Sequence, residues 1–361
     1  MNSYNFHFVR HLMSCNNITE GKKEFGGKDF DPSGTIYGIT ETIVLSKNSK
    51  EFSNKEVYVS NLIRTWITAF LLYGTNNNDI LKLFVSPYLK EKHETFKRGN
   101  YPKEIAHTVK KFEFFLQKLK TYAESNEPMF EYLNVDWYNS LPKSLHIILP
   151  DETGKLSQTI LYTKDENNLY TIRNFCNVKD TVGPISNNKQ YLETGDLTKF
   201  MNWFTQNIVI KNTSLVHVVT HSQVMQSYLL SKFNYDLNKE SETNQKAAEV
   251  RHSNSWRFVT NLQTDLLPTL VSGIPLKKKE AKNIEKYIKQ QGATQIPQKG
   301  KLAIGSLCGQ QGSIDTKATP ICLQPVKVGG KIKKKSKKYK KRKSKTVKLY
   351  KKVKTNKTYK K

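Results

Sequence analysis

The stretch Phe8-Val-Arg-His-Leu-Met-Ser-Cys-Asn-Asn17 places an arginine–histidine pair directly after a short apolar segment. Residues 4–9 are mostly aromatic or β-branched, a composition typical of a buried strand. In open α/β sheets, ligands bind beyond the carboxyl ends of the strands. Arg10 and His11 are therefore candidates for a site at the edge of a sheet.

Two other segments repeat this arrangement. Residues 215–219 have the clearest strand pattern of the chain, and His221 follows directly after Thr220. Residues 56–59 also predict a strand, and Arg64 lies near the start of the helical pattern that comes next. Because parallel strands end at the same edge of a sheet, we expect these three basic positions to lie together.

Strand and helix patterns alternate along much of the chain, which predicts an α/β fold with a mostly parallel sheet. Residues 81–85 add another strand. The expected helices comprise residues 61–72, a segment that begins at Pro102 and continues to 119, residues 197–207 with Asp196 as the N-cap, and residues 222–232.

One region interrupts the alternation. Residues 145–149, 159–163 and 169–172 have short strand patterns, and the links between them are rich in Asp, Asn, Gly and Glu, as in tight turns. This favours a small antiparallel insertion, at about residues 129–190, within a folded domain that comprises residues 1–273.

The positive charge of the chain is concentrated at its end. The formal net charge is +28, of which residues 331–361 carry +18 with no acidic residue and residues 274–330 carry +7, which leaves +3 for residues 1–273. We expect residues 274–330 to be a linker with a surface helix at 274–291. Residues 331–361, with little to bury, are expected to be a disordered Lys-rich tail.

The composition of the tail suggests a polyanionic partner but does not indicate which one. Its lysines are interleaved with Tyr339, Tyr350 and Tyr359, which suits nonspecific binding of nucleic acid or another polyanion, and residues 333–343 also suit nuclear import. We find no signal peptide and no apolar segment long enough to span a bilayer. The four cysteines show no zinc-site spacing. These observations predict an intracellular, cytoplasmic protein.

Four segments, in order, resemble motifs of the histidine phosphatase superfamily, also called phosphoglycerate mutase-like. Arg10-His11 resembles the start of its Arg-His-Gly signature, and Ser60-Asn-Leu-Ile-Arg-Thr-Trp-Ile-Thr-Ala69 resembles its S-D-L-x-R-T-x-x-T-A segment. Tyr88-Leu-Lys-Glu91 resembles its L-x-E segment, and Val218-Val-Thr-His-Ser222 its V-x-H-G segment. The resemblance covers roughly residues 4–260.

The sequence departs from the family pattern at three positions. Leu12 and Ser222 stand where the family usually has Gly, and Asn61 stands where it usually has Asp. We expect the side chain of Leu12 to crowd the backbone near a bound phosphate, since glycine leaves that space open. The insertion has no family pattern, so the substrate is not indicated.

The resemblance implies a three-layer α/β/α sandwich and a phosphomonoesterase that works through a phosphohistidine, without a metal or other cofactor. In this interpretation His11 is the nucleophile, and Glu91 is the general acid and base, with Glu94 as a competing carboxylate. The phosphate ligands that it implies are Arg10, Arg64, His221 and Asn17, with Asn16 as the alternative to Asn17.

Two alternatives remain at this stage. Phosphoglycerate mutase activity is less favoured, because no segment suggests a site for a phosphoglycerate. The other is a catalytically weak or inactive protein of the same fold that docks phosphorylated partners while its tail binds a polyanion. His7 and His217 lie inside presumed strands, and we interpret both as structural residues.

Overall fold

The computed structural model describes part of the chain, and all of that part belongs to one compact unit. The described residues are 5–14, 31, 33–48, 52–76, 79–91, 105–125, 133–151, 153–173, 195–207, 215–233, 257–261 and 269–271. Asn16, Asn17, Glu94, the expected helix at 274–291 and the tail lie outside them. Among the described residues, no helix combines the length and apolar character needed to cross a membrane.

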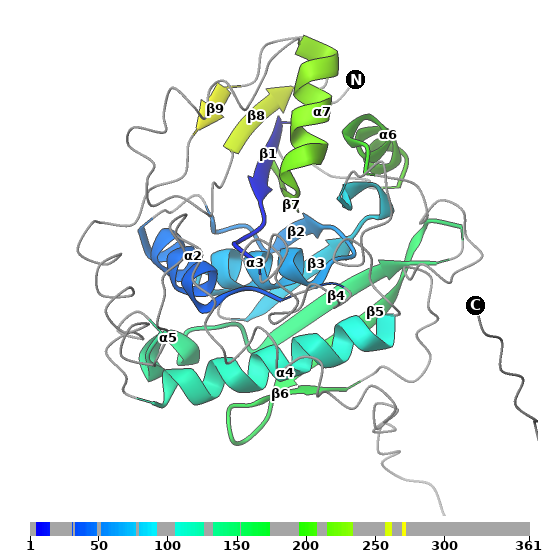
Figure 1. The fold of residues 1–361 in the computed structure, drawn as a ribbon. Coiled ribbons are helices and arrows are strands. Elements are labelled where there is room, and N and C mark those ends of the chain that lie inside the picture. Colours follow the sequence, from blue (N-terminus) through cyan, green and yellow to red (C-terminus); the bar gives the residue numbers. More distant parts are fainter. Residues whose placement is uncertain are drawn as a thin grey trace, which may run out of the picture. The chain divides into compact units, whose positions relative to one another are not determined.

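Strands and helices alternate through the described part (Figure 1). The strands are β1 (Asn5–Arg10), β2 (Glu56–Val59), β3 (Ile80–Val85), β4 (Ser144–Pro150), β5 (Leu156–Lys164), β6 (Tyr170–Ile172), β7 (Leu215–Thr220), β8 (Arg257–Asn261) and β9 (Thr269–Val271). The helices are α2 (Ile36–Asn48), α3 (Ile63–Gly74), η3 (Pro87–Leu89), α4 (Ile105–Ala123), α5 (Val135–Asn139), α6 (Leu197–Asn207) and α7 (Ser222–Phe233).

All nine strands form one sheet, in the order β6-β5-β4-β3-β2-β7-β1-β8-β9. The five central strands, from β4 to β1, pair in parallel, whereas β5, β6, β8 and β9 add antiparallel edges. The mostly parallel α/β sheet expected from the sequence is confirmed.

The expected antiparallel region continues the main sheet. Its first strand, β4, pairs in parallel with β3 and so belongs to the main sheet, and β5 and β6 then extend that sheet at its edge. The strand positions were predicted correctly. The sequence analysis left their partners open, because local patterns do not show which strand pairs with which.

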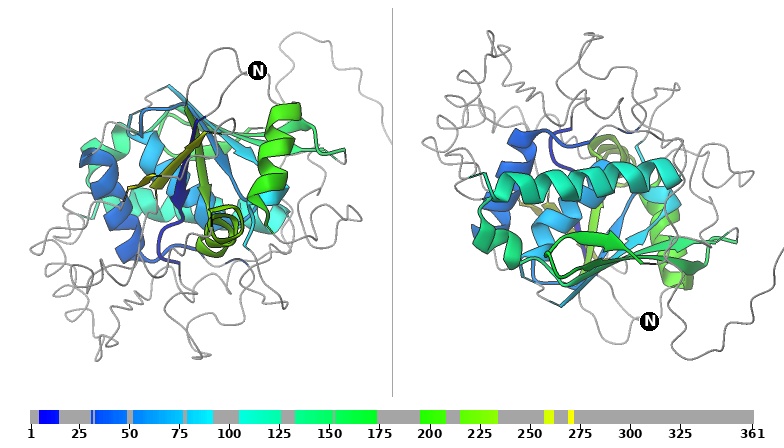
Figure 2. Two further views of the ribbon diagram at one scale, coloured as in Figure 1. Left: turned by 90° about the horizontal axis from the view of Figure 1, so that it is seen from above. Right: turned by 90° about the horizontal axis from the view of Figure 1, so that it is seen from below.

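Alternating strand residues build one apolar cluster on each face of the sheet. Val57 and Val59 belong to the cluster that includes residues of α2, α3, α4 and α5, whereas Tyr58 belongs to the cluster with α6 and α7. Figures 1 and 2 show α4 and α7 on opposite sides of the strands. The fold is thus the expected three-layer α/β/α sandwich.

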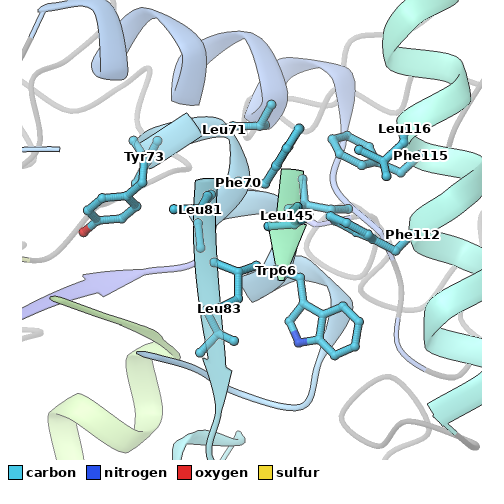
Figure 3. Packing of buried hydrophobic residues seen from close by; sticks show 14 of the residues in the cluster. Trp66, Phe70, Leu71, Tyr73, Leu81, Leu83, Phe112, Phe115, Leu116 and Leu145 are labelled. Atoms are coloured by element: carbon cyan, nitrogen blue, oxygen red, sulfur yellow. The ribbon is translucent and has the colours of Figure 1, made fainter. Parts of the chain in front are cut away.

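Helix α3 is buried along its whole length, because the sheet lies on one side of it and α4 on the other (Figure 3). The rings of Trp66 and Phe70 pack edge-on against Phe112 of α4, with centroids 5.9 and 6.0 Å apart. Apolar side chains lie on every side of α3, and such a helix is buried on every side. Because the whole helix is buried, Arg64 in its first turn is buried too.

The N-cap expected for α6 is present. The carboxylate of Asp196 accepts hydrogen bonds from the backbone N–H groups of Thr198, at 2.9 Å, and Lys199, at 3.2 Å. The backbone N–H of Asp196 donates to the carbonyl of Tyr88, at 2.9 Å. The start of α6 is thereby fixed to the segment that leads to Glu91.

Candidate active site

The two histidines that follow strands lie side by side. Arg10, the last residue of β1, is in register with Thr220, the last residue of the neighbouring parallel strand β7. The backbone N–H of His11 donates to the carbonyl of Thr220 at 2.9 Å. The imidazole rings of His11 and His221 then lie with their centroids 4.9 Å apart, at the carboxyl edge of the sheet.

The surroundings of His11 favour one tautomer. Its Nδ1 lies 2.6 Å from the carbonyl oxygen of Leu12, which can only accept a hydrogen bond, so Nδ1 carries the proton. Its Nε2 lies 3.2 Å from Nε of Arg64, which can only donate. Burial, together with the charges of Arg64, His221 and Arg10, holds the pKa of His11 well below its usual range. The ring is therefore neutral, with a lone pair on Nε2.

Arg64 connects the other polar groups of the site. Its Nη2 lies 3.3 Å from Nδ1 of His221 and 3.5 Å from a carboxylate oxygen of Glu91. Arg10 is partly buried beside them; burial lowers its pKa, and the charges of Glu91 and Arg64 act on that pKa in opposite directions. Two guanidinium groups and one carboxylate thus surround the two imidazoles.

His221 is buried between Glu91 and Ser60. Its Nδ1 lies 3.3 Å from the carboxylate of Glu91, and its Nε2 lies 2.9 Å from Oγ of Ser60. Burial is the main reason that the pKa of His221 falls to about 4, although the carboxylate of Glu91 opposes the shift. Without a bound anion, His221 is therefore neutral at neutral pH.

Several backbone contacts fix the segment before Glu91. Thr220 donates its hydroxyl to the carbonyl of Leu89, at 2.8 Å. Gly195 approaches the same segment so closely that a Cβ there would lie 1.8 Å from the carbonyl oxygen of Lys90. Glu91 is consequently presented to the site by two elements, β7 and the start of α6.

The side chain of Leu12 does not crowd the site as we expected. It is 1% exposed, belongs to the apolar cluster of α2 and α3, and points toward Gly34, where a Cβ would lie 2.5 Å from its Cδ1. Its backbone N–H donates to Oγ1 of Thr68 at 2.8 Å. The absence of a side chain at Gly34 leaves the room that Leu12 occupies.

The donor set fits an anion better than a metal ion. Potential ligand atoms of His11, Glu91 and His221 lie within 4.8 Å of one another, as a metal site would require. However, Nε and Nη2 of Arg64 lie within 3.3 Å of the two imidazoles. A cation would have to displace a guanidinium that already occupies this space, whereas a phosphate would be attracted to it.

The structure brings together four of the residues singled out from the sequence, His11, Arg64, Glu91 and His221, with Arg10 beside them. Asn17 and the competing Glu94 lie outside the described residues. His7 and His217 face each other across β1 and β7, with their Nδ1 atoms 3.3 Å apart, and Tyr73 contacts His217 at 3.1 Å.

Two residues that contact the site, Ser60 and Asp31, were not predicted to have a role in it. Ser60 lies in the segment used for the resemblance, and its position directly after β2 was a usable signal. Asp31 carries no such signal, because its partners lie 32 or more residues further along the chain. Its contacts became visible only in the folded structure.

Comparison with known proteins gives structural matches only. No protein-family model and no curated protein matches the sequence. Solved structures do match. The chain is similar to a phosphoserine phosphatase from Entamoeba histolytica (13% identity, 76% of this chain and 98% of that one, TM-score 0.33) and to a phosphoglycerate mutase from Bacillus anthracis (13%, 79% and 96%, 0.34). A mycobacterial glucosyl-3-phosphoglycerate phosphatase also matches (11%, 75% and 98%, 0.31).

Proposed function

We propose that this protein belongs to the histidine phosphatase superfamily and is a phosphomonoesterase in which His11 accepts the phosphoryl group. One observation carries the proposal: Nδ1 of the buried His11 is held by the carbonyl of Leu12, which leaves the lone pair of Nε2 directed at the guanidinium of Arg64. A neutral imidazole beside a fixed cation can attack a phosphorus atom whose oxygens that cation holds.

The charges of the site suit a phosphate monoester. Arg64 and Arg10 provide planar, permanently charged donors for the phosphoryl oxygens. A bound dianion would favour the protonated form of His221, which is neutral without it, because an opposite charge nearby raises the pKa of an imidazole. Binding of the ester would thus recruit a third cationic donor.

The reaction would proceed in two steps. The bound phosphate dianion favours the protonated form of the nearby Glu91, which takes this proton from solvent. Nε2 of His11 attacks phosphorus, the bond between phosphorus and the ester oxygen breaks, and Glu91 gives its proton to the departing alkoxide. In the second step Glu91, now a carboxylate, takes a proton from water as the water attacks the phosphohistidine. Inorganic phosphate leaves, and both residues regain their starting states.

The decisive test is the phosphoenzyme. Hydrolysis is measured with the full-length protein and para-nitrophenyl phosphate. In a second assay the protein is mixed with a labelled phosphate ester and quenched in base, which preserves phosphohistidine. We expect hydrolysis and an acid-labile label, and expect His11→Ala to lose both, with turnover reduced by about 10³-fold or more. A matched control is His146→Gln, at a half-buried histidine of β4, which should keep both.

The same experiment distinguishes an active phosphatase from an inactive protein of the same fold that binds phosphorylated partners. A protein that binds phosphate but neither hydrolyses esters nor takes up the label would be a docking protein with a phosphatase-like fold. Full activity of His11→Ala would refute the role of His11 itself. A screen of phosphorylated metabolites with the active protein would then identify the substrate class.

A further inference from the structure

Asp31 is a buried carboxylate that the mechanism above does not use. It is 0% exposed, and its φ of 49° places it in the left-handed region, which few residues other than glycine adopt. Asp tolerates this conformation better than most residues, yet it still costs free energy. Because burial of an unpaired carboxylate costs free energy, specific partners must stabilise Asp31 in this position.

The first partner is the start of α3. Both carboxylate oxygens of Asp31 accept a hydrogen bond from the backbone N–H of Ile63, at 3.0 and 2.8 Å. The N-cap position of this helix is occupied by Leu62, whose side chain cannot cap it. Asp31 therefore does from a distant segment what an N-cap residue ordinarily does locally, and its charge also complements the positive end of the helix dipole.

Asp31 also contacts two buried cations and a hydroxyl group. Nη1 of Arg64 lies 4.0 Å from the carboxylate of Asp31, and Nζ of Lys111, on α4, donates to the backbone carbonyl of Asp31 at 3.0 Å. The hydroxyl of Thr108 approaches the carboxylate at 3.5 Å. These groups, from α3 and α4, are the charged and polar partners described for Asp31.

The two sides of the Arg64 guanidinium thus face different residues. Nη1 faces Asp31, while Nε and Nη2 face His11 and His221. Because a guanidinium is planar, attraction at one nitrogen restrains the directions in which the other two can donate. Asp31 also fixes the helix end from which Arg64 projects.

We propose that Asp31 is a positioning residue that orients the guanidinium of Arg64 toward His11 and His221. The proposal rests on the function proposed above, since it is the phosphoryl group that Arg64 would hold. Asp31 touches none of the reacting atoms; it acts through Arg64 and through the start of α3.

The titration of Asp31 makes this role visible in a pH profile. Burial raises the pKa of Asp31 to about 6, although Lys111 and Arg64 oppose the shift. The pKa values of His221, about 4, and of His11, well below its usual range, lie lower. As the pH falls through about 6, Asp31 gains a proton and loses its attraction for Arg64, and kcat/KM, which reports the pKa values of the free enzyme, should decline.

The test compares Asp31→Asn with Thr108→Val in the full-length protein. Asn keeps an oxygen that can accept from Ile63 but has no charge, whereas Val removes only a 3.5 Å contact with the same carboxylate. We expect Asp31→Asn to lower kcat at pH 7.5 by about 10- to 100-fold, the scale of a misplaced catalytic group. Thr108→Val should stay within about twofold of the wild type, because so long a hydrogen bond is weak.

The pH profile gives a second readout. Protonated Asp31 is as uncharged as Asn, so the ratio of kcat/KM in the wild type to kcat/KM in Asp31→Asn should fall toward one below pH 6. Titration of the phosphate ester affects both proteins alike and cancels in this ratio. Wild-type kcat in Asp31→Asn, or a ratio that does not change with pH, would overturn the proposal. If Asp31→Asn does not fold, Asp31→Ser, which also removes the charge, takes its place, and wild-type kcat in that variant would overturn the proposal.

A third readout does not depend on turnover. The Nε–H proton that Arg64 donates to His11 should give a slowly exchanging NMR signal, which Arg64→Lys identifies by its loss. We expect Asp31→Asn to accelerate its exchange, and an unchanged signal would refute the role of Asp31. If the wild type hydrolyses no ester but Asp31→Asn still alters this signal, the proposed function fails while the positioning role stands.

Discussion

Nε of Arg64 lies 3.2 Å from Nε2 of His11, so one guanidinium nitrogen contacts the ring nitrogen proposed to attack phosphorus. The same guanidinium contacts His221 and Glu91 through Nη2. An incoming phosphate must therefore meet the nucleophile and its cation together. The geometry of the fork, and not only its charge, should matter for transfer.

Arg64→Lys tests this point. Lysine keeps the charge but offers one compact donor group in place of a planar fork, so it cannot contact His11 and His221 in the same way. We expect kcat/KM for a phosphate ester to fall by about 10²-fold or more, the scale of losing two charge-assisted hydrogen bonds. The matched control is Arg173→Lys, at an exposed arginine that donates to Thr163, which should leave kcat/KM unchanged. Equal activity of the two variants would contradict the role of the fork.

Glu91→Gln tests the general acid. The variant should lower kcat by about 10²–10⁴-fold and spare the binding of inorganic phosphate, because Gln cannot give a proton to the leaving oxygen. The loss should be smaller with para-nitrophenyl phosphate than with an alkyl phosphate, since para-nitrophenolate leaves without help. Glu94→Gln is the comparison: if it loses activity while Glu91→Gln keeps it, the wrong carboxylate has been assigned.

The stability of the protein should depend on pH through His221. Its pKa of about 4 in the folded state lies below the ordinary value of 6.5, so the unfolded chain binds the proton more readily. Its contribution to stability is complete above pH 6.5 and declines as the pH falls from there toward 4. His11, with a lowered pKa, acts in the same direction, whereas Asp31, with a raised one, opposes both below pH 6.

Urea unfolding of the wild type and of His221→Gln at pH 7.5 and pH 5 measures this contribution. The wild type should lose about 2 kcal/mol more than the variant between the two pH values, because Gln does not titrate. The comparison uses differences within each protein, so the cost of the substitution itself cancels. Equal losses in the two proteins would show that His221 is not buried in its neutral form.

The contact between Leu12 and Gly34 gives a further prediction. Adding a methyl group at residue 34 places it against the buried Leu12 side chain, and Gly34→Ala should lower the free energy of unfolding by about 1–3 kcal/mol. In a Leu12→Ala background the same change should cost much less, because the opposing atoms are gone. A urea double-mutant cycle measures the difference, and additive effects would show that the two residues do not share this space.

Local patterns in the sequence were enough to locate most of the central strands and the helices α3, α4, α6 and α7, because burial on one or both faces leaves a periodic signal. Helix α2 was missed, and so were β8 and β9. The residues of β8 and β9 add antiparallel pairs at an edge, and nothing in a short segment specifies its partner strand.

In the site, too, residues marked by a local pattern could be predicted and residues that depend on tertiary contacts could not. His11, Arg64 and His221 were recognisable because each follows a strand, and parallel strands bring their ends together. Asp31 was not, because its function depends on contacts with Ile63 and Lys111 that are made only when α3 and α4 pack. Leu12 was misjudged for a related reason, since the space it needs is provided by a glycine 22 residues away.

The last prediction concerns residues 331–361, which carry +18 of the formal net charge of +28. A chain that ends at residue 330 should keep the kcat of the full-length protein on a small phosphate ester, because the groups proposed for catalysis lie between Arg10 and His221. It should bind nucleic acid much more weakly. Binding to duplex DNA should also become less dependent on salt, since each DNA phosphate that the protein no longer neutralises reduces the steepness of the log–log slope by about 0.9.

The control is a full-length chain in which the lysines and arginine of residues 331–361 are replaced by glutamine, which keeps the length and removes the charge. If charge is responsible, this chain should bind DNA as weakly as the truncated one. Tight DNA binding by the truncated chain in moderate salt would refute the division between a phosphatase domain and a polyanion-binding tail. A drop in kcat on truncation would also refute this division, because the tail would then be needed for the chemistry or for recruiting the substrate.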